Sequence, residues 1–593
     1  MKRAAPLSLL ALASPCLGKI QNNPEILASV KGGIAGWLYD RGIFGSYPSV
    51  QYKSFGAESP QVNRVQKDDR CDDGLVFIAP RGSSVNTPGP MILDNDGNLV
   101  WMQTSWGQAA DLKVQTVGSQ SFITFWHDQP SSVGGGGSGQ GAYVVLDHSY
   151  RFVKEIKPAG GLGGDFHEFK LTQNGTALLT VYNRTKTDIY ALGLQHGWVI
   201  DSVFQEVNIT TGELIFEWRA SEYFTIEDTL SSAQKDGAGS SPEQALDFFH
   251  INSVDKDADG NYLVSAANMH TVLCISSKDG SLLWQLGGEE TAFRELSGGA
   301  ATSFSRSSDV KWHNDSTITL FDSNDGWKSS RGLMLEVNST GKTATLLHEY
   351  RAPAGIRSRS DGSMQLLPNG NVLVGWGDIP AFTEYSADGE VLCDTHTAPV
   401  AFAKLGWVRS YRTYKFPWVG NPQTKPDVAV RPDEDAVYVS WNGATEVAGW
   451  VLDAYDPEQK EDAGAASHAG RTAVEKTGFE TRIAFPKDAP ESNRVAAVDR
   501  NGNILAWSKP VLRNVETTPL YFSQPSDGGE RSVEAATVLC GLALVTVVSI
   551  GAMLCSRWVA VAWTALARRR KTRSWTRMEY EYRTLGKSDK GLV

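Results

Sequence analysis

Two histidines are the first candidates for chemistry. Each lies in a short motif at the start of an apolar run. His167 lies in DFHEF (165–169) and His250 lies in DFFHINS (247–253). Near neutral pH an imidazole can donate a hydrogen bond to an oxyanion or move a proton. A lone histidine is more often a buried structural side chain, so the pair gains meaning only if the fold brings both rings to one place.

The elements that must position them are short β-type runs separated by tight turns. YLV (262–264) and TVLCI (271–275) are bounded by DGN (259–261) and DG (279–280), whose residues tolerate positive φ. Similar turns recur at 96–98, 211–213, 340–342, 369–371 and 388–390. Antiparallel meanders repeated every few tens of residues predict an all-β chain with a β-propeller. Innermost strands and loops of several blades converge on a propeller's channel, so His167 and His250 could face one pocket.

Several motifs resemble the fungal branch of the arylsulfotransferase family, and the match runs from about residue 69 to 513. They are FHINSVD (249–255), DFHEF (165–169), DVKWH (309–313), RGSS (81–84) with PMI (90–92), and PNGNVLVGWG (368–377). The resemblance implies six blades, where the turns alone support four to six. It also implies transfer of a sulfuryl group from a phenolic ester to another phenol through a sulfated histidine, without a nucleotide donor or other cofactor.

The resemblance also assigns site residues. His167, His250 and Asn252 match substrate-pocket positions of the family, and Asp309 and His313 of the downstream motif are further candidates for substrate binding. Two positions depart from the family's pattern. The nucleophilic histidine of its Gln-His-Asp string is replaced by Ser308, and Ala267-Asn268 stands where an arginine usually grips the sulfate. Losing such a charge-assisted contact weakens transition-state stabilisation.

Replacement groups can be named from the sequence, but none is compelling. Ser308 could act as the nucleophile with His250 or His167 as base, although a serine sulfate ester is a poor leaving system. His270 or His313 could take the place of the missing histidine. Strand alternation does not show that either of these two faces the channel.

Two functions of different class therefore remain open. In the first, the chain is an arylsulfotransferase-like enzyme with an altered site. In the second, it is a propeller without catalysis that binds small aromatic or sulfated ligands, glycans or a surface protein. A quinone-dependent dehydrogenase is a third reading, which rests on the Asp-Gly-x-Leu-x-Trp turns alone. The presence or absence of a nucleophile at the position of Ser308 separates the first two.

Composition supports a turn-rich β protein with a large core. The 593 residues are 41% hydrophobic and only 21% charged, and they include 58 glycines. The net charge of −11 and the absence of a basic stripe with interleaved aromatic residues argue against a nucleic-acid partner. No cysteine and histidine spacing suggests zinc, so no metal site is expected.

Hydropathy predicts a type I membrane protein of the secretory pathway or cell surface. We expect a signal peptide at 1–18, an N-terminal extension at 19–68, the propeller at 69–420, an immunoglobulin- or fibronectin-like β-sandwich at 425–513, a stalk at 514–534, one transmembrane helix at 535–556 and a basic cytoplasmic tail at 557–593. The membrane would thus be a partner through that helix alone, with the bulk of the chain lumenal or extracellular.

Cysteines and sequons fit such a compartment. Outside the signal and the span only Cys71, Cys274 and Cys393 remain. Cys71 lies early and Cys393 late in the propeller, so a disulfide between them could clasp the ring, while Cys274 fits a buried thiol. Five sequons for N-glycosylation lie within the propeller, at Asn174, Asn183, Asn208, Asn314 and Asn338.

Overall fold

The computed structural model describes residues 33–128, 140–190, 193–230, 237–324, 329–353, 356–456 and 471–518. The predicted signal peptide, most of the stalk, the predicted transmembrane helix and the tail lie outside these residues. Within the described ranges, no helix combines the length and the apolar character needed to cross a membrane.

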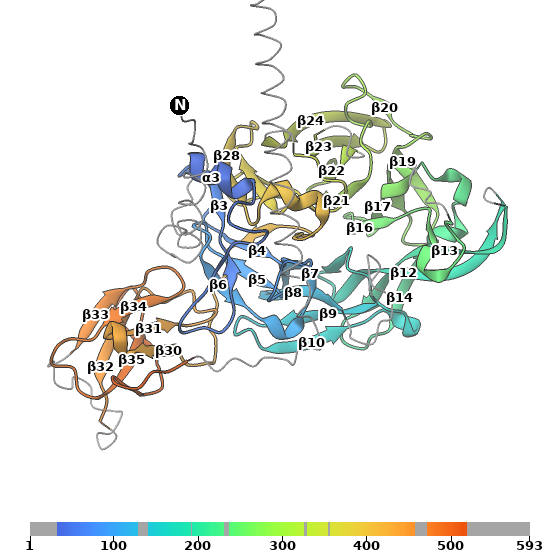
Figure 1. Cartoon of the computed structure of the whole chain (residues 1–593). Coiled ribbons are helices and arrows are strands. Elements are labelled where there is room, and N and C mark those ends of the chain that lie inside the picture. Colours follow the sequence, from blue (N-terminus) through green and yellow to red (C-terminus); the bar gives the residue numbers. More distant parts are fainter. Residues whose placement is uncertain are drawn as a thin grey trace, which may run out of the picture. The chain divides into compact units, whose positions relative to one another are not determined.

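Six antiparallel sheets of four or five strands follow one another along the chain (Figure 1). In order they are β29–β4–β5–β6, β7 to β10, β11 to β14, β16 to β19, β21 to β24 with β20, and β25 to β28 with β3. We number them as the first to the sixth sheet. This mostly β architecture confirms the predicted all-β class, and its repeated meanders are propeller-like.

The strand bounds show how short the repeated units are. The first three sheets contain β29 (Tyr414–Phe416), β4 (Leu75–Ile78), β5 (Met91–Leu93), β6 (Leu99–Met102), β7 (Ala109–Val117), β8 (Gln120–Asp128), β9 (Gly141–Leu146), β10 (Phe152–Ile156), β11 (Phe169–Leu171), β12 (Thr176–Ile189), β13 (Leu194–Asn208), β14 (Leu214–Arg219) and the parallel β15 (Leu246–Asp247). The last three contain β16 (Ile251–Lys256), β17 (Tyr262–Ala266), β18 (Thr271–Ile275), β19 (Leu282–Gly287), β20 (Arg294–Glu295), β21 (Ser307–Trp312), β22 (Thr317–Asp322), β23 (Arg331–Asn338), β24 (Thr343–Arg351), β25 (Ser363–Leu366), β26 (Val372–Gly375), β27 (Ala381–Tyr385), β28 (Val391–His396) and β3 (Asn63–Gln66).

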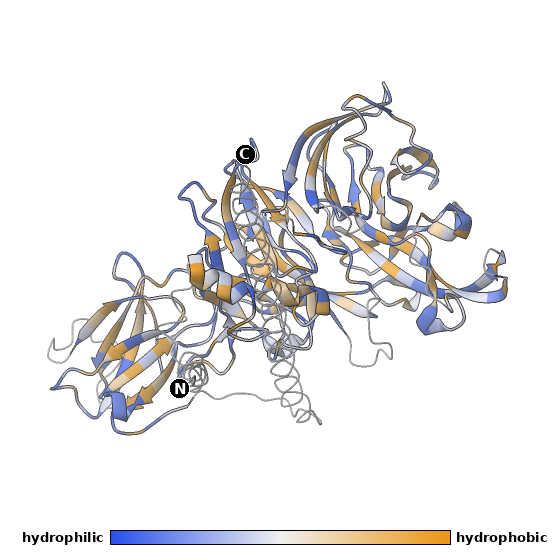
Figure 2. Ribbon diagram, turned by 45° about the horizontal axis from the view of Figure 1, so that its top comes forward, coloured by the Kyte–Doolittle hydropathy of each residue, from blue (hydrophilic) through white to orange (hydrophobic). Residues whose placement is uncertain are grey.

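Local sequence explains both the strands and their turns. Every residue of β9, β17 and β18 is buried, as expected of strands that are covered on both faces and carry continuous apolar runs. The β16–β17 hairpin closes at Gly260, whose φ of 85° favours glycine. There the Asp257 carboxylate accepts the Asn261 N–H over 2.7 Å. Figure 2 shows the apolar residues along the strands and many polar residues at the connecting turns.

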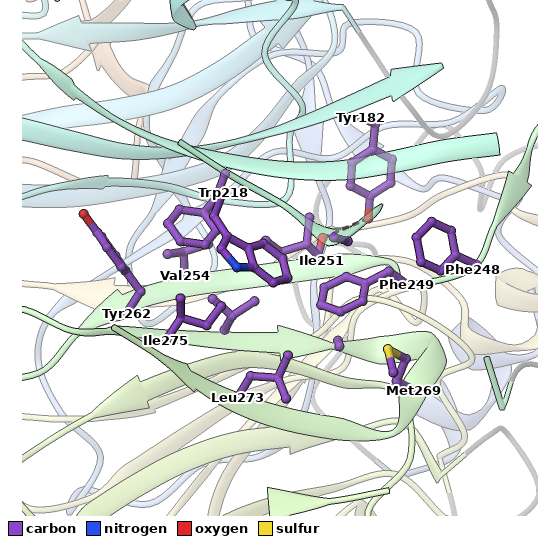
Figure 3. Packing of buried hydrophobic residues seen from close by; sticks show 14 of the residues in the cluster. Tyr182, Trp218, Phe248, Phe249, Ile251, Val254, Tyr262, Met269, Leu273 and Ile275 are labelled. Carbon is purple, nitrogen blue, oxygen red and sulfur yellow. Dashed lines mark hydrogen bonds between the residues drawn. The ribbon is translucent and has the colours of Figure 1, made fainter. Parts of the chain in front are cut away.

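Each pair of neighbouring sheets shares one apolar cluster, so the core is divided among the interfaces of the ring. Between the third and fourth sheets, Trp218 and Phe249 pack with ring centroids 5.6 Å apart (Figure 3). The Tyr182 hydroxyl crosses the same interface and donates to the Ile251 carbonyl over 2.8 Å. Truncating an aromatic side chain in such a cluster costs about 3–5 kcal/mol, so the sheets hold one another in place.

The ring is closed from both ends of the chain. The early strand β3 pairs with β28 of the sixth sheet, and the late strand β29 pairs with β4 of the first sheet. The predicted disulfide Cys71–Cys393 is present beside this closure, with Cα atoms 6.5 Å apart. Cys274 is a buried free thiol, as expected. The innermost strands β16, β21, β25, β29, β7 and β11 contact one another in that order, and the third sheet completes the ring by contacting β16 through β12 and β13.

Two further sheets follow the ring and share a cluster of their own. One has the order β30 (Asp427–Arg431), β31 (Ala436–Ser440) and β34 (Thr481–Ala484). The other joins β33 (Thr472–Glu475), β32 (Gly449–Ala454), β35 (Ser492–Val498), β36 (Ile504–Trp507) and β37 (Val511–Leu512). Asn442 exchanges two hydrogen bonds with the backbone of Met102 in β6, at 3.0 and 2.9 Å.

The segment ahead of the ring contributes one helix and a two-stranded ladder. The helix is α3 (Gly33–Asp40), and the ladder joins β1 (Ser49–Val50) to β2 (Ser59–Pro60). Asp40 at the end of α3 lies 2.8 Å from Nδ1 of His396, at the end of β28. Asp394 Oδ2 lies 3.7 Å from Nε2 of the same ring. Two carboxylates thus flank His396, and they raise its pKa to about 9 despite the opposing effect of burial.

Candidate active site

Sheet topology brings one residue set to one edge of the ring. In a meander of four antiparallel strands, the fourth strand ends at the edge where the first began, and the next sheet starts from there. The innermost strands therefore all start at the same edge, which we call the histidine face. The residues just ahead of these strands are His167 before β11, His250 before β16, Arg306 before β21, Asp361 before β25 and Tyr411 before β29.

The two predicted histidines meet at this face. Their ring centroids lie 4.9 Å apart and the ring planes are inclined by 77°. His167 is stacked between Phe166 and Tyr182, with centroids 4.3 and 4.9 Å away. Its side chain is 2% exposed and that of His250 is 19% exposed. His250 has a φ of 58°, and this left-handed backbone turns its ring toward His167 instead of continuing the strand.

An aspartate holds each ring by the same atom. Asp165 Oδ1 contacts Nδ1 of His167, and Asp247 Oδ2 contacts Nδ1 of His250. Because a carboxylate accepts, Nδ1 is the donor, and the neutral imidazole then presents a lone pair at Nε2. Neither Nε2 has a hydrogen-bond partner among the described residues. The second oxygens, Asp165 Oδ2 and Asp247 Oδ1, are buried and lack partners in the same part of the chain.

Arg306 supplies a positive charge next to these pairs. It is half-buried, and its Nη1 donates to Asn268 Oδ1 over 3.1 Å. Burial raises the pKa of Tyr182 well above its usual range, and the charges of Asp247 and Asp165 raise it further, whereas Arg306 opposes the rise. The arginine, both carboxylates and the tyrosine therefore share one electrostatic environment.

A second arginine approaches the buried histidine from the first sheet's side. The Arg81 guanidinium lies 4.7 Å above the Phe166 ring and 5.7 Å from the Tyr411 ring, as a cation over aromatic faces. One of its nitrogens is 3.8 Å from Asp361 Oδ2. Tyr411 itself donates its hydroxyl to the His167 carbonyl over 2.9 Å. The histidines thus have aromatic walls and two nearby guanidinium groups.

Ser308 is placed differently from a nucleophile. Its side chain is 1% exposed, and its hydroxyl lies 3.1 and 3.3 Å from the carbonyl oxygens of Gly362 and Asp361, to which it donates. Both contacts tie it to the sixth sheet. The described geometry therefore gives Ser308, which the sequence predicts at the position of the family's nucleophile, an interstrand packing role.

Ala267 and Asn268, which the sequence predicts in place of the family's arginine, support His250 through the backbone. The N–H of Ala267 donates to the His250 carbonyl over 2.9 Å, and the N–H of Asn268 donates to the Phe249 carbonyl. The Asn268 side chain donates to the Asp247 carbonyl over 2.7 Å and accepts from Arg306. An arginine from the next sheet therefore reaches the turn at which the expected arginine is missing.

Six charged side chains on or just ahead of the innermost strands form a group that we call the axial network. Arg412, whose side chain is 0% exposed, lies within 3.1–3.6 Å of three carboxylates, and Lys113 contacts two of the same carboxylates at 2.7 Å. Burial acts to raise the pKa of Glu168, but the neighbouring cations outweigh it and hold this pKa well below its usual range. The network consists of Asp111, Lys113, Glu168, Asp309, Lys311 and Arg412.

Two residues predicted to bind substrate belong to this network instead of the histidine pair. Asn252 accepts from Arg412 at its side-chain and backbone oxygens, over 3.2 and 3.0 Å. Asp309 accepts the Tyr414 hydroxyl over 2.8 Å and lies 2.7 Å from the Lys311 ammonium. The side-chain oxygens of both residues are occupied by protein partners.

The two remaining histidines named from the sequence lie elsewhere. His313 follows β21, at the edge opposite the histidine face, and its Nε2 is 2.7 Å from the Thr319 hydroxyl. Burial, followed by the Lys311 charge, lowers its pKa to about 4. His270 ends the turn between β17 and β18 on the histidine side, with a φ of 53°. His313 therefore lies away from the pair formed by His167 and His250.

Sequence reasoning assigned no role to Asp165, Asp247, Arg306, Arg81 or Tyr182. A signal existed for the first two, because an aspartate precedes each histidine by two or three residues. Such short spacing at a strand start lets the carboxylate fold back onto the ring. The arginines come from other sheets: Arg81 belongs to the RGSS motif (81–84), which does not show that it lies beside His167, and Arg306 belongs to none of the motifs.

Comparison with known proteins gives one family. Residues 113–398 match the model of the Arylsulfotransferase (ASST) family, a segment that runs from within β7 to the end of β28 and contains both histidines. A search of curated proteins gave no match.

Solved structures show only distant likeness. A protein of unknown function from Bacteroides caccae is 14% identical over 57% of this chain and 98% of its own, with a TM-score of 0.33. A streptogramin B lyase is 12% identical over 64% and 93% of the two chains, with a TM-score of 0.30. A protein from Lactobacillus plantarum is 11% identical over 75% and 97%, with a TM-score of 0.31. Likeness at this level says nothing of function.

Proposed function

We propose that the chain is an arylsulfotransferase-like protein that moves a sulfuryl group from a phenolic sulfate ester to a phenol at the paired histidines. The observation that carries the proposal is the arrangement of two aspartate–histidine pairs with facing rings, each with its Nδ1 held and its Nε2 left without a partner in the described chain. The family match over residues 113–398 supports the reaction class.

In the first half-reaction, Nε2 of His250 attacks the sulfur of the donor ester. The S–N bond forms, the S–O bond to the aryl group breaks, and the phenolate leaves and takes a proton from water. Nδ1 keeps its proton on Asp247, whose negative charge stabilises the sulfated imidazolium. His250 is preferred to His167 because its ring is the more exposed.

In the second half-reaction, His167 acts as the base. The acceptor phenol gives its proton to Nε2 of His167 while its oxygen attacks sulfur, and the S–N bond breaks to regenerate His250. His167 then returns the proton to solvent. The sum is one sulfate ester and one phenol converted into the other ester and the other phenol. Asp165 holds the base in the required tautomer and stabilises its charged form.

Arg306 takes the role that Ala267 cannot fill. Its guanidinium is fixed by Asn268 and lies in the electrostatic environment of both aspartates, where it can donate to the equatorial oxygens of the sulfuryl group. Phe166, Tyr182 and Tyr411 provide aromatic surface for the donor and acceptor rings.

A second function is favoured by one observation. The Ser308 hydroxyl is committed to backbone carbonyls, and the family resemblance predicts this residue at the nucleophile position. On that basis the histidine face would bind aryl sulfates without turning them over. This is the non-catalytic alternative, and it requires that His250 form no bond to sulfur.

Location in the secretory pathway, with a membrane anchor near the C-terminus, is part of the proposal. Its support is the Cys71–Cys393 disulfide, because disulfides persist in oxidising compartments. The predicted signal peptide and span add to it from hydropathy alone.

The test incubates the full chain with a chromogenic aryl sulfate and a phenol, then maps sulfated peptides by mass spectrometry. We expect turnover and a sulfated His250, and we expect His250→Gln to lower turnover by about 10²-fold or more. His348→Gln, which changes an exposed histidine on β24, is the matched control. Binding of the ester without turnover or sulfation would establish the second function, and sulfation of another residue would refute the role of His250.

A further inference from the structure

Four of the five N-glycosylation sequons lie at one edge of the ring. Asn174 lies in the turn between the first and second strands of the third sheet, and Asn208 ends the third strand of that sheet. Asn314 and Asn338 occupy the same two places in the fifth sheet. In a four-stranded meander these two turns lie at the edge opposite the start of the first strand. We call this edge the sequon face, and it is opposite the histidine face.

Hydrogen bonds show that the two sequon turns of a sheet are neighbours. In the third sheet the N–H of Ile209 donates to the Gly175 carbonyl over 3.1 Å. In the fifth sheet the N–H of Val337 donates to the Ser316 carbonyl over 2.7 Å. The four asparagines therefore form two pairs, one on each of two sheets separated by the fourth sheet.

The side chains in these turns are oriented for modification. Asn208 Oδ1 accepts the N–H groups of Thr210 and Thr211 at 2.8 and 3.1 Å. Asn314 Oδ1 accepts those of Ser316 and Thr317 at 2.9 and 2.8 Å.

Three asparagines of the sequon face, Asn174, Asn314 and Asn338, are exposed, and Asn208 is half-buried. Asn338 Oδ1 accepts the Gly341 N–H over 2.7 Å, and the side chain of Asn174 is open to solvent. At all four residues the amide nitrogen Nδ2, the atom that carries a glycan, has no hydrogen-bond partner among the described residues. In three of them the side-chain carbonyl oxygen accepts a backbone N–H within the turn, so the hydrogen bonds of the turn leave Nδ2 free.

Asn183 has the same sequence signal but a different position. It lies in the middle of β12, where it is half-buried and directly opposite Asp201 of β13. Its neighbour Tyr182 reaches into the histidine pair. At this position β12 is paired with β13 alone, because β11 pairs with β12 no further than Leu179. A glycan at Asn183 would have to leave a paired strand, and not a turn, while the long β12–β13 ribbon forms.

We propose that N-glycans occupy Asn174, Asn208, Asn314 and Asn338, that Asn183 stays unmodified, and that carbohydrate is thereby confined to the sequon face. In each case Nδ2 attacks the anomeric carbon of a lipid-pyrophosphate-linked oligosaccharide. The N–C bond forms, the bond from that carbon to the pyrophosphate oxygen breaks, and the proton lost from Nδ2 leaves with the lipid pyrophosphate. The inference rests on the proposed secretory location but not on the proposed sulfuryl transfer, and it leaves the histidine face clear of sugar.

The experiment expresses the full chain in a eukaryotic secretory host and releases N-glycans enzymatically in ¹⁸O-water, which converts each glycosylated asparagine into ¹⁸O-labelled aspartate. Peptide mass spectrometry of the wild-type chain then reads all five positions without any variant. We expect label at the four turn positions and none at Asn183. Label at Asn183, or its absence from either pair, would overturn the proposal, as would a chain without glycans.

Single substitutions give a second readout by gel mobility. Asn174→Gln, Asn208→Gln, Asn314→Gln and Asn338→Gln should each increase mobility by one glycan step. Asn183→Gln is the matched control within the same sheet and should leave mobility unchanged. A mobility step for Asn183→Gln together with none for Asn174→Gln would reverse the assignment of faces.

Discussion

The axial network and the histidine pair are two polar groups in one ring, and they differ in how completely their atoms are used. In the axial network three carboxylates face three cations, and among its atoms in the described chain Arg412 Nε is left without a partner. In the histidine pair, the buried oxygens Asp165 Oδ2 and Asp247 Oδ1 have no partner in the described chain. The aspartates use their other oxygens to hold Nδ1 of each ring.

This difference separates stability from function. Buried polar atoms that lack partners cost folding free energy, and they are found more often at sites that bind a ligand or react, so the histidine pair is the better candidate for function. In the axial network the buried charges balance one another, so its role is to hold the inner strands together.

The largest expected effect comes from opening the axial network. Arg412→Met removes the cation shared by Asp111, Glu168 and Asp309 and leaves buried charge uncompensated, which should lower the free energy of unfolding by about 3–5 kcal/mol. Denaturant unfolding of the purified chain measures it. Arg151→Met, which breaks the exposed pair with Asp147, is the control and should cost less than about 1 kcal/mol. Equal effects of both substitutions would show that the axial network stabilises the fold no more than an exposed ion pair does.

A change in the histidine pair should act on turnover and not on stability. Asp247→Asn replaces the acceptor of His250 Nδ1 with an amide, which no longer holds the tautomer with a free Nε2. We expect kcat to fall by about 10²-fold, equivalent to about 2.7 kcal/mol of activation free energy. The free energy of unfolding should change by less than about 1 kcal/mol. A large loss of stability with unchanged kcat would place this aspartate with the structural groups.

His396 tests how a histidine between two carboxylates changes the pH dependence of stability. Its folded pKa of about 9 lies above the ordinary value, so its contribution is complete below about pH 6.5 and is lost as pH rises through 9. The free energy of unfolding should therefore fall by about 2 kcal/mol between pH 7 and pH 10. His396→Gln should abolish most of this decrease. A His396→Gln chain with the same pH profile as the wild type would show that Asp40 and Asp394 do not hold the proton.

Substitution of Arg306 should give the smallest of these effects. It separates the contribution of the guanidinium geometry to kcat/KM from that of its charge. Arg306→Lys keeps the charge but loses the planar fork, so kcat/KM for an aryl sulfate should fall by about 10-fold. Arg306→Gln should fall further because the charge is lost as well. Steady-state kinetics of both variants, with Arg357→Lys as a surface control, measures the difference. Identical kinetics for all three chains would remove Arg306 from the site.

Much of the architecture can be predicted from the turn pattern. Recurrent Asp-Gly and Asn-Gly turns between short apolar runs specify hairpins, and hairpins in series specify the sheets. The meeting of His167 and His250 follows from the same reasoning, because both precede a first strand. Even-numbered meanders place such residues at one edge.

Other features depend on local geometry that the pattern does not contain. Strand β21 has a register shift between Ser308 and Lys311, and Asp309 within it has a φ of 52°. This bulge breaks the alternation of side chains, so Asp309 turns into the axial network, where regular alternation does not predict it. Arg306 was missed for a related reason, since its own φ of 52° sets the direction of its side chain.

The double closure of the ring has a consequence for synthesis of the chain on the ribosome. The first sheet lacks its innermost strand until β29 has been made, and the disulfide beside it joins cysteines separated by 322 residues. Such remote pairings form slowly and late. The histidine face therefore takes its final form only after nearly the whole ring has emerged. A chain that stops before Tyr414 would expose unpaired strand edges at both ends and depend on chaperones for its survival.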